Sequence, residues 1–83
     1  MANFETYPSM TYLMKYLTIV TNITERHDEG RVRVMLLGRA AIYYAALNNE
    51  LLLDMLRKSL LERIEIQLDF DADTLEILRA DYV

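Results

Sequence analysis

The chain has 83 residues, the size of one small domain, so we expect a single domain over residues 1–83. It contains no cysteine, which excludes disulfides, thiolate metal sites and cysteine nucleophiles together. The net charge is −4 and no basic face is evident, so this acidic protein does not have the charge pattern of a nucleic-acid-binding domain.

The start of the chain and its apolar runs bear on localisation. Met1–Glu5 lacks the cationic region and apolar core of a secretory signal. The longest uncharged run, Ala40–Asn49, is far shorter than the ~20 apolar residues that a membrane span needs. We therefore expect a soluble, cytoplasmic protein with no membrane partner.

Residues 9–28 show a helical pattern. At about 100° per residue, their most polar side chains fall within one arc that no apolar residue enters. Adjacent apolar pairs such as Leu13-Met14 do not fit the alternation of a strand, which would place them on opposite faces. The pattern predicts a helix over about 9–28, and Gly30 follows its last turn as a stop signal.

An N-terminal hairpin is the alternative for the end of this segment. Residues 27–30 can form a turn with Gly30 in the left-handed conformation, and the alternating Arg and Val of residues 31–34 suit a strand. The fold would then be α+β.

From residue 31 to residue 47, apolar side chains lie nearly all round a helical wheel. Such a helix is normally buried on every side, which a domain of this size can hardly achieve alone. We therefore expect a helix over 31–47 that is covered by a second copy, as a homodimer, or by another protein. The residues expected at this interface are Val32, Leu36, Ala40, Tyr43, Tyr44 and Leu47, together with Leu51 and Met55 of the next segment.

Three shorter segments complete the chain. Asn49 can cap an amphipathic helix over about 49–64, and residues 71–74 can cap a last helix over about 73–82. Between them, residues 64–70 alternate strictly, so this segment is extended or strand-like, and the sequence leaves open whether it is a strand. The predicted fold class is all-α, a small helical bundle of three to four helices.

No constellation of acid, base and nucleophile can be assembled from the sequence. The only histidine, His27, lies beside two carboxylates but near no fixed nucleophile, so a capping or solvated role is the simpler interpretation. Residues 69–73 resemble the opening of a calcium loop but lack its glycine and its final glutamate. We therefore assign no catalytic residue, metal ligand or cofactor, and expect a protein that is not an enzyme.

The cationic side chains concentrate at Arg31, Arg33 and Arg39. Arginine suits bidentate recognition of phosphate or carboxylate, so these residues are candidates for anion binding with Tyr43 or Tyr44. The simpler interpretation is a set of solvated or interhelical ion pairs.

Two functional hypotheses follow. The first is a small protein-interaction module, a regulator or inhibitor, that acts through an apolar helical surface as a homo-oligomer. The alternative is a binding module for a small anionic ligand or nucleotide, which would use the Arg/Tyr cluster.

Overall fold

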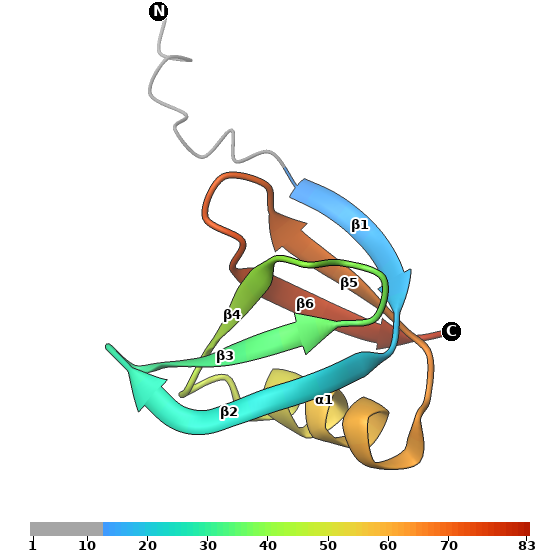
Figure 1. The fold of residues 1–83 in the computed structure, drawn as a ribbon, viewed down its shortest axis with the longest axis horizontal. Helices are drawn as coiled ribbons and strands as arrows, with labels where there is room; N and C mark the ends of the chain where they lie inside the picture. The colour runs from blue at the N-terminus through green and yellow to red at the C-terminus, as the bar shows by residue number, and fades with distance from the viewer. Residues whose placement is uncertain (1–12) are drawn as a thin grey trace, which may run out of the picture.

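The computed structural model describes residues 13–83, apart from the side chains of residues 25–28. This range forms six strands in two three-stranded antiparallel sheets, with one helix (Figure 1). The elements are β1 (Leu13–Thr18), β2 (Val20–Asp28), β3 (Arg31–Leu36), β4 (Ile42–Ala46), α1 (Glu50–Glu62), β5 (Ile66–Asp71) and β6 (Ile77–Tyr82). The prediction of an all-α bundle is therefore wrong, and the α+β alternative comes closer.

The two sheets, β1-β5-β6 and β2-β3-β4, are joined on two sides. On one side only Ile19 separates β1 from β2, so a single stretch of chain passes from one sheet to the other. On the other side the Tyr44 N–H of β4 donates to the Leu75 carbonyl at 3.0 Å, and a parallel bridge pairs Tyr44 with Glu76. Helix α1 packs against β2 and β6, beneath the sheets in Figure 1.

The core lies between the sheets and the helix, and alternate strand residues fill it. In β3 every second side chain is buried, while its neighbours face outward. The buried apolar residues are Val20, Val32, Val34, Leu36, Tyr43, Ala45, Leu52, Leu53, Leu56, Ile66, Leu68, Phe70, Ile77 and Ala80.

The predicted helix over 31–47 is two strands, β3 and β4, joined by a loop. Each strand alternates with a period of two, but the loop shifts the phase between them, so their apolar residues fill a helical wheel on every side. The argument for a homodimer depended on that helix. Without it, this segment gives no reason to expect a second copy.

The predicted helix over 9–28 is β1 and β2, and its residues 9–12 lie outside the described range. The break at Ile19 and two register shifts in β2 interrupt the alternation of this segment, and the apolar pair Leu13-Met14 occurs because both side chains are exposed. The hairpin alternative is confirmed: β2 and β3 are antiparallel, and Glu29 and Gly30 at the turn have φ of 56° and 78°. Two successive positive φ angles are typical of a type I′ turn.

The predicted helix over 73–82 is also wrong, because this region contains strand β6. The Asp71 carboxylate accepts hydrogen bonds from the Asp73 and Thr74 N–H groups at 2.7 and 3.2 Å, as a helix cap would. Here the same bonds stabilise the connection between β5 and β6. The segment that the sequence left open, residues 64–70, contains most of strand β5.

Helix α1 is the predicted helix that the structure contains. Asn49 precedes it and its side chain accepts a hydrogen bond from the Leu52 N–H at 3.3 Å, as expected of a cap. The helix ends at Arg63, which has a left-handed conformation. No helix within residues 13–83 is both long and apolar enough to cross a membrane.

Ser59 joins this helix to the point where the chain changes sheets. Its buried hydroxyl accepts a hydrogen bond from the Val20 N–H at 3.0 Å and donates one to the Ile64 carbonyl at 2.6 Å. Val20 begins β2, and Ile64 follows the end of α1. One side chain therefore satisfies two backbone groups from distant parts of the chain.

We predict that Ser59→Ala lowers the free energy of unfolding by about 1–3 kcal/mol, because it leaves the buried Val20 N–H without an acceptor. Chemical denaturation followed by circular dichroism measures the change. Glu62→Ala, at an exposed position of the same helix, is the control and should change stability by less than about 0.5 kcal/mol. Equal effects of the two substitutions would contradict this role of Ser59.

Candidate functional site

The outward face of the β2-β3-β4 sheet brings together two of the three predicted anion-binding arginines. Arg31 and Arg33 alternate with the buried Val32 and Val34, so their side chains leave the core. Arg33 lies opposite Tyr44 in the register of β3 and β4. The guanidinium carbon of Arg31 lies 4.2 Å from the centroid of the Tyr44 ring, a cation–π contact.

Arg31 also borders a hollow at the end of this sheet. Glu29, Gly30 and Arg31 line it on one side, and residues 46–48 line it on the other. A 2.7 Å hydrogen bond from the Leu47 N–H to the Gly30 carbonyl connects the two sides. A backbone hydrogen bond therefore joins the two sides of the hollow, and its lining includes the cationic side chain of Arg31.

Among the acids whose side chains the structure describes, Glu29 contacts Arg31. Its Oε1 lies 3.9 Å from Arg31 Nη2, and its side chain is 81% exposed. A long ion pair at an exposed position contributes little to stability. Glu29 therefore leaves the Arg31 guanidinium able to accept another anion.

Arg39 does not join this cluster. Its guanidinium carbon lies 4.8 Å from the Tyr16 ring centroid, 5.9 Å from that of Tyr43 and 5.7 Å from that of Phe70. It therefore packs over an aromatic group that links β1, β4 and β5. The predicted set of three arginines is divided between two places.

The loop that carries Arg39 is held at its start. The hydroxyls of Tyr16 and Thr18 both donate to the Leu37 carbonyl, at 3.2 and 3.0 Å. Gly38 follows with a φ of +84°, and an added Cβ would lie 2.9 Å from the Tyr16 hydroxyl oxygen. The position is therefore restricted to glycine by its backbone and by its neighbour.

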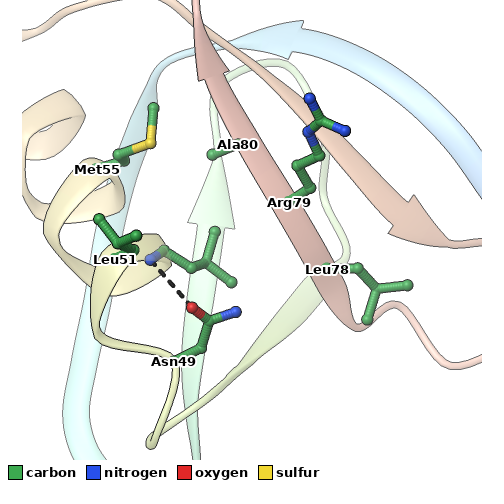
Figure 2. A pocket seen from close by; sticks show the side chains of 7 residues that line it. Asn49, Leu51, Met55, Leu78, Arg79 and Ala80 are labelled. Carbon is green, nitrogen blue, oxygen red and sulfur yellow. Dashed lines mark hydrogen bonds between the residues drawn. The ribbon is translucent and has the colours of Figure 1, made fainter.

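The eight predicted interface residues do not share a surface. Val32, Leu36 and Tyr43 are buried in the core, where they cannot contact a partner. Leu51 and Met55 do lie together, in a groove between α1 and β6 (Figure 2). Of the others, Ala40 is exposed, and Tyr44 and Leu47 are partly buried.

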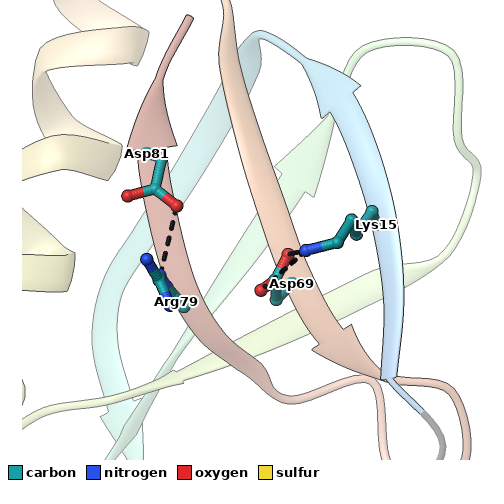
Figure 3. A network of polar contacts seen from close by, with 4 residues as sticks. All are labelled: Lys15, Asp69, Arg79 and Asp81. Carbon is teal, nitrogen blue, oxygen red and sulfur yellow. Dashed lines mark hydrogen bonds and ion pairs between the residues drawn. The ribbon is translucent and has the colours of Figure 1, made fainter.

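The outer face of the other sheet carries ion pairs that the sequence did not reveal. Lys15 Nζ contacts Asp69 Oδ1 at 3.1 Å, and Arg79 Nε contacts Asp81 Oδ2 at 3.1 Å (Figure 3). Lys15 and Asp69 are 54 residues apart and meet because β1 and β5 pair in register. Each of these four charged side chains therefore has an opposite charge beside it.

Two further observations concern chemistry. Among the side chains that the structure describes, those of residues 13–24 and 29–83, no group of three or more His, Asp or Glu could hold a metal ion. The side chain of His27 lies outside the described part of the structure, although its backbone belongs to β2.

The fold defines the chain as a small antiparallel β domain with one helix packed against its sheets. No protein-family model matches the sequence, and no curated protein does. Two solved structures share the fold. A crystal structure of pro-protein-glutaminase has a TM-score of 0.76 and 20% identity, over 86% of this chain and 26% of that one. A mutant of pro-protein-glutaminase has a TM-score of 0.75 and 17% identity, over 87% and 26%.

These similarities correct the expectation that the chain is not an enzyme. Their names describe an enzyme precursor, so the fold occurs within the chain of an enzyme. The chain spans about a quarter of the length of those chains, and at this identity the likeness shows the fold alone. The lack of a catalytic pattern in the sequence is therefore no ground for excluding an enzyme.

We predict that Gly38→Ala lowers the free energy of unfolding by about 1–3 kcal/mol, since it combines an unfavourable φ with a contact to Tyr16. Gly30→Ala is the matched control, because Gly30 has a φ of +78° but nothing within 4 Å of an added Cβ. Thermal and chemical denaturation of both variants separates the two effects.

Adding Tyr16→Phe to Gly38→Ala should recover part of the loss, because it removes the hydroxyl that the new Cβ contacts. If Gly38→Ala were no more destabilising than Gly30→Ala, the contact with Tyr16 would not contribute to the loss in the free energy of unfolding.

Proposed function

We propose that this chain is a binding module for a small anionic ligand, which it recognises through Arg31, Arg33 and Tyr44. The observation that carries the proposal is the stacking of the Arg31 guanidinium on the Tyr44 ring, at 4.2 Å, beside the hollow at Gly30. Arginine presents a planar fork of donors that matches phosphate and carboxylate.

Stacking supports binding because it restricts the guanidinium before a ligand arrives. A long side chain that is ordered on binding costs about 0.5–1.5 kcal/mol, and contact with an aromatic ring reduces this cost. Arg33 lies two residues after Arg31 in β3 and therefore adds a second positive charge to the same face.

The hollow supports a ligand of limited size. Its lining combines Arg31 with the small residues Gly30 and Ala46 and with the amide of Asn48. Small-molecule sites commonly place a few polar groups in a concave and partly apolar surface.

We predict that Arg31→Ala combined with Arg33→Ala weakens binding of inorganic pyrophosphate by at least about tenfold, because charge-assisted hydrogen bonds contribute about 1.5–3 kcal/mol each. Titration followed by amide chemical shifts measures the affinity, and the shifts should centre on Gly30, Arg31 and Leu47. Arg79→Ala is the control, because Arg79 lies on the other sheet and is paired with Asp81. Shifts that persist in the double variant would refute the proposal, as would the absence of any shift in the wild type.

Glu29→Gln provides a test in the opposite direction. The Glu29 carboxylate competes with a ligand anion for Arg31 at 3.9 Å, so removing its charge should strengthen pyrophosphate binding about two- to fivefold at low salt. The same titration measures it. Weaker binding in this variant would show that the anion is not held beside Arg31.

The wider hypothesis of a protein-interaction module stays a prediction. Its apolar surface is not a helix over 31–47, because that segment is two strands. Within it Val32, Val34, Leu36 and Tyr43 are buried, whereas Met35, Leu37 and Ile42 are exposed. The groove that contains Leu51 and Met55 is the apolar surface that favours it.

A further inference from the structure

A groove runs between the first half of α1 and strand β6. Leu51, Leu52 and Met55 line it from the helix, and residues 78–80 line it from the strand. Figure 2 shows Leu51 and Met55 on the helix side and Ala80 on the opposite side. Leu51 is 77% exposed, which leaves a large apolar side chain in water at the rim.

The strand side of the groove has an unpaired backbone edge. Within residues 13–83, β6 pairs with β5 alone, and the last backbone bond on its other side is the one from Tyr44 to Leu75. Beyond Glu76, therefore, the N–H and C=O groups of β6 that point away from β5 have no backbone partner in this range.

Three consecutive residues of β6 line the groove, although neighbouring strand residues normally face opposite sides of a sheet. A bulge accounts for part of this, because Phe70 pairs with Ile77 and Asp69 with Arg79, which leaves Leu78 as the extra residue. The groove accordingly offers both side chains and the backbone edge of β6.

We propose that this groove binds an extended peptide segment of a partner protein, which adds a strand to the open edge of β6 and inserts an apolar side chain between Leu51, Met55 and Ala80. An unpaired strand edge is complementary to an extended chain, since each supplies the donors and acceptors that the other lacks. The chain already shows such pairing at this edge, where β4 meets residues 75 and 76 in parallel orientation.

The dimensions favour a single side chain as the anchor. The groove between α1 and β6 has a volume of about 210 Å³, below the roughly 300 Å³ at which pockets for whole small molecules begin. An apolar anchor with main-chain hydrogen bonds on one side is the arrangement expected for a peptide that extends a sheet. This site is separate from the arginine face, so it goes beyond the anion-binding proposal.

The wild-type chain is used to select binders from a phage-displayed library of random peptides of about twelve residues. A synthetic copy of the selected peptide is then titrated against the wild-type chain and its variants. We expect Leu51→Asp to weaken this peptide at least about tenfold, because a charge enters the anchor site. Leu61→Asp is the matched control: Leu61 lies on the same helix, is 78% exposed and does not line the groove. It should leave the affinity within about twofold.

Backbone pairing has its own readout. The selected peptide should slow hydrogen exchange of β6 amides, and N-methylation at alternate residues of the peptide should weaken it about tenfold or more. The proposal is overturned if no peptide is selected, if Leu51→Asp and Leu61→Asp behave alike, or if N-methylation has no effect. Concentration-dependent protection of β6 without peptide would assign the groove to a second copy and also overturn it.

Discussion

The hydroxyl of Ser59 holds the place where the chain leaves one sheet and enters the other. At this bend the ladder of β1 and β5 has ended and that of β2 and β3 is beginning, so the Val20 N–H donates its hydrogen bond to a helix side chain. The same hydroxyl binds the Ile64 carbonyl, which leads into β5. One buried hydroxyl therefore connects α1 both to the start of β2 and to the segment that leads into β5. Such a group is costly to leave unsatisfied, which gives the bend a defined geometry.

Local patterns in the sequence predicted the elements that are continuous and misjudged those that are interrupted. Helix α1 was predicted because thirteen residues follow one period and Asn49 precedes them. Strands β1 to β4 were missed because Ile19, the bulges of β2 and the 37–41 loop each shift the alternation by a residue or more. When strands with different phases of alternation are read as one segment, their apolar residues are distributed around a helical wheel as in a buried helix. Similarly, Asp71 has the same hydrogen-bonding capacity in a hairpin connection as in a helix cap, and only the pairing of β5 with β6 decides between the two.

The candidate site was predictable in its chemistry and not in its geometry. The residue types of Arg31 and Arg33 indicated anion binding, and Tyr44 was named as a partner, because arginine and tyrosine carry the same chemistry in any fold. Which arginine joins which ring depends on register: Arg33 lies opposite Tyr44, whereas Arg39 lies beyond the end of β3 and packs on Tyr16. The groove at β6 was equally hidden. Leu51 and Met55 were identified as a surface, but the strand edge opposite them exists only once β6 is a strand.

Tyr44 links the stability of the fold to the arginine face, because two different parts of the residue have two different tasks. Its backbone N–H donates to Leu75 and joins the sheets, while its ring lies under the Arg31 guanidinium. A substitution that changes the ring leaves the N–H in place, so the connection between the sheets can persist when the stacking is lost. Arg31 and Tyr44 lie on neighbouring strands of one sheet, so their contact depends on the pairing of β3 with β4 and not on Leu75. The arginine face can therefore be altered without unfolding the domain, and a ligand that depends on this contact binds while β3 and β4 remain paired.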